Sequence, residues 1–471
     1  MVTSFEQVEG RADLEDACDA VVVGTGAGGG AIAAELAEGG RDVVMLEEGG
    51  HYTARDFTLD APEMLKKLYR NAGTAVIRGR PNIIFSEGRC VGGSTVVNGG
   101  ICWRTPEKVL KRWVWEHGLD GMTPAKLDPI FAKVEERVHA APQDPGSVGE
   151  DSELLRAGAE RLGYRVVPVK RNQVHCCGTN NCVFGCPTDA KRSTLVAYVP
   201  RVLANRGRLY AKCRAERILV ENGRAVGIVG RFRDPESGRF GPRLTVRAKV
   251  VILAAGAIQT PALLQRNKLA NSSGQLGRNF LIHPNAKAIA IYDRDVLGWK
   301  GTIQGYQIHE FVDEGIVLTT SFVPPGLLAL SFPYFGRESL EVMRDYNRMI
   351  AAGALVEDTH AGRVSLDWFG EAKMSYQLDA HDVHQLVRGI ALLSEIYFES
   401  GARRVLLPFA GLEEIRSPDE IRKLFERPIP PEELECLTVH AMGTCRMGVD
   451  PRRSVVGPFG EAHDVRNLFV A

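Results

Sequence analysis

The sequence has no long hydrophobic run: no segment reaches the roughly 18 apolar residues that a membrane-spanning helix requires. The first twenty residues carry several acidic side chains and no apolar stretch of signal-peptide length, so we expect a cytoplasmic protein without a transmembrane segment. The sequence also lacks net charge, with 58 basic and 58 acidic residues, and gives no reason to expect nucleic acid as a partner. These 471 residues show no internal repeat and no low-complexity linker, so we expect domains that are interleaved in sequence.

Glycine, by contrast, is abundant, and the first cluster of glycines follows a short apolar run. Residues 18–23 (CDAVVV) predict a buried strand, followed by Gly24, Gly26 and Gly29, an alanine-rich helix, and a second apolar run at 42–50. In such a β–α–β unit the first glycine permits the turn, the second lets a pyrophosphate approach the backbone, and the third lets the helix pack on the strand. The phosphates then meet free N–H groups at the helix N-terminus, which indicates a dinucleotide site.

A carboxylate at the end of the second apolar run completes this predicted site. Glu47 lies at the sequence distance expected of a residue that binds the ribose hydroxyls, and Glu48 is the alternative. The glycine motif does not distinguish FAD from NAD, so an NAD-dependent dehydrogenase stays open at this point.

A second glycine-rich segment distinguishes the two cofactors. Residues 88–100 (GRCVGGSTVVNGG) resemble the first signature of the glucose-methanol-choline oxidoreductases, which use FAD to oxidise CH–OH groups. The resemblance implies that small residues here let the backbone pass against the flavin and the pyrophosphate, while two polar side chains offer hydrogen bonds. The residues assigned to FAD in this way are Gly88, Gly92, Gly93, Ser94 and Asn98.

Three further segments resemble the same family, in the same order. Residues 256–261 (GAIQTP), which begin with Gly256, are similar to the second signature, and residues 276–284 (LGRNFLIHP) are similar to the loop that follows it. Residues 440–448 (HAMGTCRMG) resemble the segment that carries the catalytic histidine. An NAD enzyme would have no use for these segments. His283, in the second of them, is interpreted as a loop histidine that holds the backbone.

The resemblance implies the chemistry of alcohol oxidation, in which the hydroxyl loses a proton while a hydride leaves the carbon for the flavin. The proton acceptor needs a pKa near the working pH, which an imidazole has without strong perturbation. We therefore expect His440 to be the active-site base, or the acceptor of the hydroxyl hydrogen bond.

The end of the sequence departs from the family pattern. In the family a second histidine or asparagine follows the first by a few dozen residues, but this sequence stops at Ala471, in an apolar run. Neither His463 nor His381 can be given that role from its spacing. We expect a C-terminus that is cut short, and the alternative function is a catalytically incomplete FAD-binding fragment or assembly subunit.

Four cysteines lie close together, at Cys176, Cys177, Cys182 and Cys186. Closely spaced thiolates suit an iron–sulfur cluster, and the segment resembles the cluster-binding stretch in the catalytic subunit of bacterial FAD-dependent glucose dehydrogenases. That resemblance implies electron transfer from the flavin to an acceptor protein such as a cytochrome. Structural thiols, a disulfide and a zinc site remain as alternatives, although zinc sites usually contain C-x2-C pairs.

These features predict an α/β fold: a Rossmann-type FAD-binding domain interleaved with a substrate domain built on an antiparallel sheet. We expect the FAD-binding domain at 1–110 and 209–299, a helical and cysteine-rich segment at 111–208, the substrate domain at 300–435, and an incomplete catalytic segment at 436–471.

The substrate is predicted to be a small-molecule alcohol or sugar. Residues 300–435 are expected to line its pocket, but their chemistry is too mixed to select one class. The run at 322–334 (FVPPGLLALSFPY) favours an apolar substrate slightly, although the same residues suit a hydrophobic core equally well.

Overall fold

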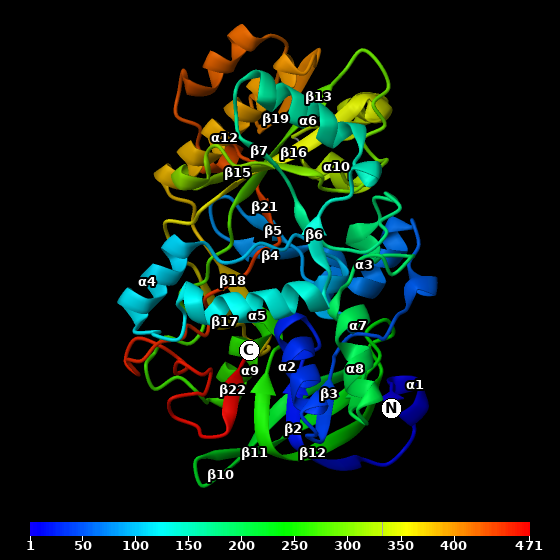
Figure 1. Cartoon of the computed structure of the whole chain (residues 1–471), viewed down its shortest axis with the longest axis vertical. Helices are drawn as coiled ribbons and strands as arrows, with labels where there is room; N and C mark the ends of the chain where they lie inside the picture. The colour runs from blue at the N-terminus through cyan, green and yellow to red at the C-terminus, as the bar shows by residue number, and fades with distance from the viewer. Residues whose placement is uncertain (332) are drawn as a thin grey trace.

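Two β-sheets organise the chain, and the computed structural model describes residues 1–331 and 333–471. In Figure 1 the sheet that contains β2 and β12 occupies the lower half of the molecule, and the sheet that contains β13 and β16 occupies the upper half. Both labelled termini lie beside the lower sheet. This mixed architecture confirms the predicted α/β fold with an antiparallel second sheet.

The first sheet has a parallel core extended by an antiparallel meander. Its buried central strands are rich in valine, as expected for parallel strands covered on both faces. The strands, in spatial order, are β1 (Val2–Thr3), β9 (Arg208–Tyr210), β3 (Val43–Leu46), β2 (Leu14–Val23), β12 (Phe240–Leu253), β11 (Arg224–Arg233) and β10 (Cys213–Glu221).

The predicted β–α–β unit is formed by β2, α2 (Ala27–Glu38) and β3. The turn after β2 is made at Gly24, which has φ of 97°, a left-handed conformation that favours glycine. Helix α2 begins after Gly26 as its N-cap and ends at Gly39. The predicted succession of strand, turn, helix and strand is therefore confirmed.

A short strand from the far end of the sequence joins the same sheet. β22 (Leu468–Val470) pairs in parallel with the last residues of β12, and the N–H of Ala471 donates to the carbonyl of Leu253 (3.0 Å). Ala471 also lies against the first turn of α2, because a Cβ atom added at Gly28 would lie 2.8 Å from its carbonyl carbon. The expectation that the sequence is cut short stays an expectation.

The second sheet is antiparallel except where β18 meets β4 and β21 meets β5. It takes strands from distant parts of the sequence, and the four predicted domain boundaries stay predictions. The strands, in spatial order, are β17 (Arg363–Leu366), β18 (Ala372–Ser375), β4 (Ala75–Arg78), β5 (Ile83–Phe85), β21 (Leu437–Thr438), β13 (Asn285–Ile291), β16 (Met349–Val356), β15 (Ile316–Thr320), β14 (Tyr306–Ile308) and β7 (Val166–Pro168), with β19 (Arg404–Phe409) attached to β13 and β20 (Leu412–Ile415) attached to β19.

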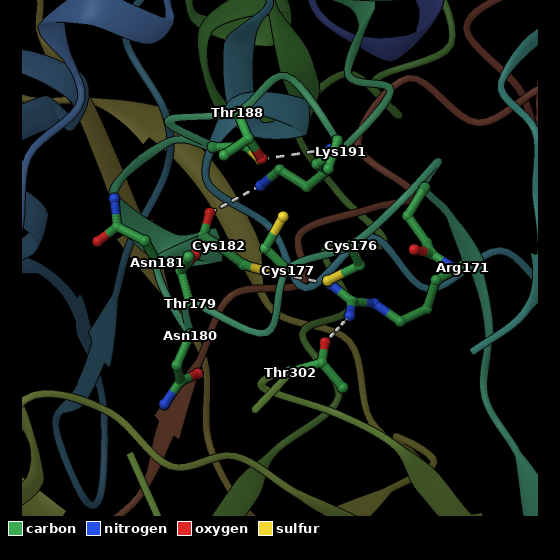
Figure 2. A pocket seen from close by; sticks show the side chains of 13 residues that line it. Arg171, Cys176, Cys177, Thr179, Asn180, Asn181, Cys182, Thr188, Lys191 and Thr302 are labelled. Carbon is green, nitrogen blue, oxygen red and sulfur yellow. Dashed lines mark hydrogen bonds between the residues drawn. The ribbon is translucent and has the colours of Figure 1, made fainter. Parts of the chain in front are cut away.

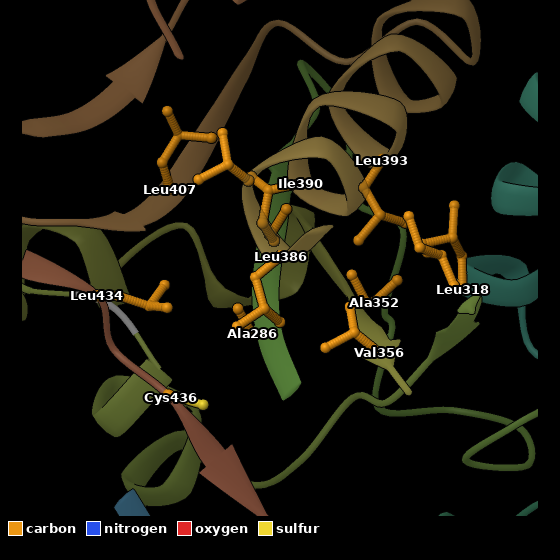
Figure 3. Close-up of a cluster of buried hydrophobic side chains, with 14 of the residues drawn as sticks. Ala286, Leu318, Ala352, Val356, Leu386, Ile390, Leu393, Leu407, Leu434 and Cys436 are labelled. Carbon is orange, nitrogen blue, oxygen red and sulfur yellow. The ribbon is translucent and has the colours of Figure 1, made fainter. Parts of the chain in front are cut away.

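Helix α12 (Ala380–Glu399) covers one face of this second sheet. Figure 3 shows Leu386, Ile390 and Leu393 of the helix above Ala286 and Ala352 of the sheet, and all five side chains are fully buried. Small alanines in the strands let the helix approach closely. Each buried leucine or isoleucine contributes roughly 1.5–3 kcal/mol relative to exposure.

The remaining helices lie around the two sheets. Residues 106–139 contain α4 (Glu107–His117) and α5 (Pro124–Arg137), and a 3-10 helix lies at Pro418–Phe425. None of the helices in residues 1–331 and 333–471 is both long and apolar enough to cross a membrane. Further helices are α3 (Ala61–Leu68), α6 (Glu150–Arg161), α7 (Thr194–Ala197), α8 (Val199–Ala204), α9 (Gly256–Asn267), α10 (Pro325–Leu328) and α11 (Gly336–Met343).

Candidate active site

The glycine loop between β2 and α2 leaves little room for side chains. A Cβ atom added at Gly24 would lie 2.4 Å from the carbonyl oxygen of Ala254, and one added at Gly29 would lie 2.1 Å from that of Gly24. Gly26 differs, because a Cβ there would meet only the Cα atom of Gly93, at 3.9 Å. The space beside Gly26 therefore stays open at the N-terminus of α2, where main-chain N–H groups favour phosphate. This geometry fits the pyrophosphate of a dinucleotide.

Glu47, which directly follows β3, is fixed beside this loop. Its carboxylate accepts hydrogen bonds from the N–H (3.1 Å) and hydroxyl (2.8 Å) of Thr25 and from the N–H of Gly49 (3.0 Å). Burial raises the pKa of the Glu47 carboxyl, and these hydrogen bonds oppose that effect. The carboxylate is thus held where a ribose ligand is expected, and its role as that ligand stays a prediction.

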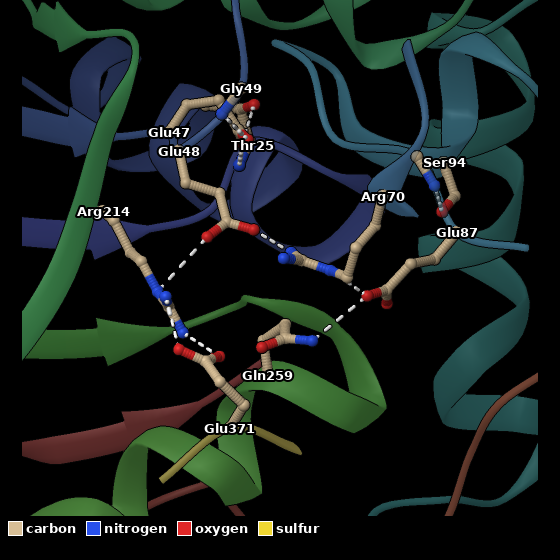
Figure 4. Close-up of polar contacts among 11 residues, drawn as sticks. Thr25, Glu47, Glu48, Gly49, Arg70, Glu87, Ser94, Arg214, Gln259 and Glu371 are labelled. Carbon is tan, nitrogen blue, oxygen red and sulfur yellow. Dashed lines mark hydrogen bonds and ion pairs between the residues drawn. The ribbon is translucent and has the colours of Figure 1, made fainter. Parts of the chain in front are cut away.

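Glu48, the alternative ribose ligand, belongs to a chain of ion pairs. Figure 4 shows its carboxylate between the guanidinium groups of Arg70 and Arg214. Arg214 also forms a bidentate pair with Glu371, at 2.6 and 2.9 Å, so the loop between β17 and β18 is joined to the nucleotide-binding sheet. Because Glu48 is occupied by two arginines, the arrangement favours Glu47 as the ribose ligand.

The chain of polar contacts continues to the second family signature. Arg70 pairs with Glu87, and the Nε2 atom of Gln259 donates to the same carboxylate at 3.1 Å. Gln259 lies in the first turns of α9, which begins at Gly256. These polar contacts therefore link the start of α9 to Glu87, the residue that precedes the Gly88–Gly100 loop.

The Gly88–Gly100 loop lies against the glycine loop. A Cβ atom added at Gly93 would lie 2.8 Å from the Cα atom of Gly26. The N–H of Gly92 donates to the hydroxyl oxygen of Thr25 at 2.9 Å. Two segments almost seventy residues apart are thus brought into contact, as the FAD assignment requires.

Two polar side chains of this loop form hydrogen bonds within the loop itself. The hydroxyl of Ser94 accepts a hydrogen bond from the N–H of Gly88 (3.0 Å), and the side-chain oxygen of Asn98 accepts one from Gly100 (3.1 Å). Both side chains are exposed, and each keeps a free donor group. Contact of Ser94 and Asn98 with FAD stays a prediction.

His440 follows β21, which places it between the second sheet and α9. Leu437 of β21 pairs with Asn285 of β13, and the segment after His440 is fixed to α9 because the hydroxyl of Thr444 donates to the carbonyl of Ala257 (2.6 Å). Ala257 is adjacent to Gly256. The predicted catalytic histidine and the second family signature are therefore brought together.

The ring of His440 is half-buried and has no hydrogen-bond partner in the part of the chain that the structure describes. Its nearest aromatic neighbour is His283, with the two ring centroids 5.6 Å apart and the ring planes at 73°. Burial, and secondly the charge of His283, lowers the pKa of His440 to about 4. The ring is therefore neutral at pH 7 and able to accept a proton or a hydrogen bond.

We predict from this pKa that His440 makes the folded state sensitive to acid. The unfolded chain takes up the proton near pH 6.5, whereas the folded chain takes it up only near pH 4, so protonation favours unfolding as the pH falls through this window. Between pH 7 and pH 5 this histidine should cost the folded state about 2 kcal/mol. Urea unfolding at both pH values measures the effect.

The test compares the wild type with His440→Gln, which cannot take up a proton. The difference in unfolding free energy between pH 7 and pH 5 should be smaller in the variant. The control is His381→Gln, because His381 is exposed in the first turn of α12. An equal loss of stability in wild type and His440→Gln would show that His440 does not resist protonation.

The other histidines considered from the sequence lie elsewhere. The Nε2 atom of His463 lies 2.9 Å from the hydroxyl of Ser454, so this ring is occupied in the segment that precedes β22. His381 is exposed. Among the described histidines, only His283 lies beside His440. The sequence predicts a structural role for His283.

The four clustered cysteines line one small pocket, shown in Figure 2. The Sγ atom of Cys182 accepts a hydrogen bond from Arg171 at 3.1 Å. Burial alone would raise the pKa of the Cys182 thiol, but the charges of Arg171 and Lys191 lower it below its usual value. Both cations are themselves buried, so the pocket favours a thiolate.

These two cations also tie the cysteine segment to the Gly88–Gly100 loop. Lys191 donates to the carbonyls of Val96 (2.7 Å) and Asn98 (2.8 Å), and Arg171 donates to that of Gly99 (2.7 Å). The cysteine pocket therefore lies directly behind a loop assigned to the flavin.

The prediction of an iron–sulfur cluster is not supported by the arrangement of the cysteines. Among the described residues, no group of three or more histidine, cysteine, aspartate or glutamate side chains could hold a metal ion. The pocket encloses about 20 Å³, which is room for one water molecule and not for several iron and sulfur atoms. The ten cysteines are all free thiols in this structure.

Comparison with known proteins identifies the family. The sequence model of the GMC oxidoreductases matches residues 65–285 and, in a second part, residues 358–471. This chain belongs to the GMC oxidoreductase family. It is thus one of the FAD-dependent oxidoreductases, and the NAD alternative is excluded.

Relatives of known sequence cover almost the whole of this GMC oxidoreductase. An uncharacterized GMC-type oxidoreductase of Mycobacterium tuberculosis is 35% identical over 96% of this chain and 71% of its own length. Another from Sinorhizobium fredii is 32% identical over 98% of this chain and 90% of its own. A long-chain-alcohol oxidase of Arabidopsis thaliana is 28% identical over 96% of this chain but only 62% of its own length.

Solved structures share the fold of this GMC oxidoreductase. Pyridoxine 4-oxidase from Mesorbium loti superposes with a TM-score of 0.70 at 18% identity, covering 96% of this chain and 93% of its own. Formate oxidase has a TM-score of 0.70 at 15% identity, covering 98% and 94%. The resemblance of the cysteine segment to glucose dehydrogenase subunits is not shown by these comparisons and stays a prediction.

Several residues at the site were missed from the sequence. Arg70, Arg214 and Glu371 join the nucleotide-binding residues to the second sheet, yet each stands alone in the sequence without a motif. Asp358, the partner of His283, is likewise isolated, 75 residues from that histidine. No signal in a single sequence identifies contacts of this kind.

Proposed function

We propose that this GMC oxidoreductase binds FAD and oxidises the CH–OH group of an alcohol or sugar, with His440 taking up the hydroxyl proton. The observation that carries the proposal is the position of His440. Its segment is bonded to the main chain beside Gly256, and its ring has no hydrogen-bond partner among the described residues.

The residues around the glycine loop fit a bound FAD. Bound FAD would supply the acceptor for the hydride that leaves the alcohol carbon. The open space beside Gly26 and the N–H groups at the start of α2 suit its pyrophosphate, and Glu47 suits a ribose hydroxyl. The residues proposed to hold it are Gly24, Gly26, Gly29, Glu47, Gly88, Gly92, Gly93, Ser94, Asn98 and Gly256.

His440 contributes proton uptake and orientation. Because its ring is neutral at pH 7, its free nitrogen can accept the hydrogen bond of a substrate hydroxyl. This hydrogen bond to the substrate hydroxyl also fixes the carbon that carries it relative to the flavin site. The half-buried ring of His440 keeps part of the surrounding water away.

The test is an absorption spectrum of the purified full chain, before and after acid release of the cofactor. Benzyl alcohol, 1-dodecanol and glucose are then added separately without oxygen. Flavin bands that one of these compounds bleaches would support the proposal. Flavin bands that none of them bleaches, or a folded protein that takes up no added FAD, would favour the alternative, a catalytically incomplete FAD-binding subunit.

The substrate class is proposed from the relatives. Long-chain-alcohol oxidases among the relatives favour an apolar alcohol as the first compound to test. The apolar run at 322–334 gives no independent support, because Phe322 and Leu328 are fully buried in a cluster with Ile289 and Leu406. Position 332 of that run lies outside the described residues.

Electron transfer through an iron–sulfur cluster to a cytochrome stays a prediction and enters no step of this mechanism. Its support is the position of the cysteine pocket behind the flavin loop, where Arg171 and Lys191 would balance the charge of several thiolates. Against it stands the small volume of the pocket. Iron and sulfide analysis of the chain purified without oxygen tests this prediction, and values near zero would end it. Stoichiometric iron and sulfide would show that the cysteine segment rearranges around a cluster.

A further inference from the structure

His283, the second histidine of the active site, belongs to a partly buried ion pair. Its Nδ1 atom lies 3.1 Å from the Oδ2 atom of Asp358. The side chain of His283 is 38% exposed, whereas that of Asp358 is 1% exposed. His283 therefore connects a buried carboxylate with the open side of the site, where the ring of His440 lies edge-on to it.

The carboxylate of Asp358 is held in place by the main chain. It accepts hydrogen bonds from the N–H groups of Ile282 (3.0 Å) and His283 (2.8 Å). Burial alone would raise the pKa of Asp358, but the hydrogen bonds from the His283 ring and from these N–H groups lower it overall, so the group is ionised at neutral pH. Within the described chain, its only ion-pair partner is His283.

We propose that His283 and Asp358 form a second proton-accepting pair, to which His440 passes the hydroxyl proton of the substrate, so that the proton comes to rest on Nε2 of His283. This inference rests on the proposed alcohol oxidation. An ionised carboxylate only accepts hydrogen bonds, so Nδ1 of His283 carries the ring proton and Nε2 is left as the base.

The electrons and the proton balance in this step. The O–H bond breaks as the proton goes by way of His440 to Nε2 of His283, and its electron pair forms the C=O bond. The C–H bond breaks as the hydride, with its two electrons, leaves for the oxidised flavin. The positive charge that appears on the ring of His283 is then paired with the carboxylate of Asp358.

His440 has the complementary role of receiving and orienting the hydroxyl. Burial, followed by the charge of His283, lowers its pKa to about 4, so a proton that it receives is readily passed on. The ionisable groups that act on His440 are His283 and Asp358. The hydroxyl of Tyr376 donates to Asp382 at 3.3 Å and also bonds to Asp358, and burial together with these two carboxylates raises the pKa of Tyr376. The charge of Asp358 should therefore control the pH dependence of the proton transfer.

Two replacements and a control test the pair. Asp358→Asn keeps the size of the side chain and removes its charge. His283→Asn suits the backbone, because His283 has φ of 44°, a left-handed conformation that asparagine tolerates well. His360→Asn is the control: His360 also contacts a carboxylate, that of Asp379 at 2.8 Å, but its side chain is 63% exposed on the surface.

The first readout is the rate of flavin reduction without oxygen, measured from pH 6 to pH 9 with the alcohol that bleaches the wild type. At pH 7 both variants should be slower by about a hundredfold, the lower end of what a general base contributes. The rate of Asp358→Asn should recover as the pH rises, because solvent base can then remove the proton. His360→Asn should keep the wild-type rate and pH profile.

The second readout needs no activity. Nitrogen NMR of the full chain, labelled in its histidines, should show His283 with its proton on Nδ1 in the wild type, and a mixture of tautomers in Asp358→Asn. His283 without a fixed tautomer in the wild type would overturn the proposal, as would wild-type rates and pH profiles in both variants with FAD bound. If the Nδ1–H tautomer is found but no alcohol reduces the flavin, the proposed function fails while the pair is confirmed.

Discussion

Replacement of His440 by alanine is expected to slow flavin reduction by at least about a hundredfold, and by up to about ten-thousandfold, without loss of FAD. The side chain lies at the edge of the cofactor site and makes no side-chain hydrogen bond to the described protein, so its removal should leave the fold and the cofactor contacts intact. What is lost is the group that accepts the hydroxyl hydrogen bond. Stopped-flow absorption after mixing with alcohol, without oxygen, measures the rate.

The control for this variant is His381→Ala, which removes an exposed histidine far along the chain in α12. The ratio of flavin to protein should be the same in the wild type and both variants. Flavin reduction at the wild-type rate in His440→Ala would remove His440 from the mechanism and leave His283 as the base to be tested.

Replacement of two glycines of the same loop should separate cofactor binding from folding. In Gly26→Ala the new Cβ atom meets only one atom of the protein, at 3.9 Å, so the chain should fold normally. The added methyl group would nevertheless occupy the space needed by the pyrophosphate, and FAD affinity should fall at least about tenfold, which corresponds to about 1.4 kcal/mol.

Gly29→Ala should instead destabilise the protein itself. Its Cβ atom would lie 2.1 Å from the carbonyl oxygen of Gly24 and 3.0 Å from the Cβ atom of Ala254, and main-chain atoms cannot move aside. A loss of about 1–3 kcal/mol or more is expected for such overpacking. Gly121→Ala is the control, because a Cβ there meets nothing within 4 Å.

Thermal unfolding of the cofactor-free proteins and FAD titration by fluorescence quenching together measure both effects. Gly26→Ala should melt with the wild type and bind FAD weakly, whereas Gly29→Ala should melt at a lower temperature. Wild-type FAD affinity in Gly26→Ala would show that the pyrophosphate does not lie at this loop.

The cofactor site could be predicted from the sequence because its geometry is set locally. Gly24, Gly26 and Gly29 lie in one turn, and the conformation of that turn follows from the absence of side chains. The same holds for the Gly88–Gly100 loop and for the start of α9. The contact between Gly26 and Gly93 follows only from the tertiary fold, and the family resemblance supplied it.

The cysteines and His283 show that the sequence alone does not predict the direction and the distant partners of a side chain. Four closely spaced cysteines suggested a set of ligands, but spacing does not determine where side chains point, and Cys182 is directed to Arg171. His283 was interpreted as structural because it was considered alone. Its partners Asp358 and His440 are 75 and 157 residues away, and only the folded sheet brings the three together.

The pairing of β22 with β12 has a consequence for how the protein is made. The two strands are separated by more than two hundred residues, so β22 leaves the ribosome long after its partner. Contacts of such long sequence separation form slowly, and until then the edge of β12 that β22 will cover is open to incorrect pairing during translation. Since Ala471 also packs against Gly28 in the first turn of α2, that turn reaches its final packing only after β22 has paired with β12.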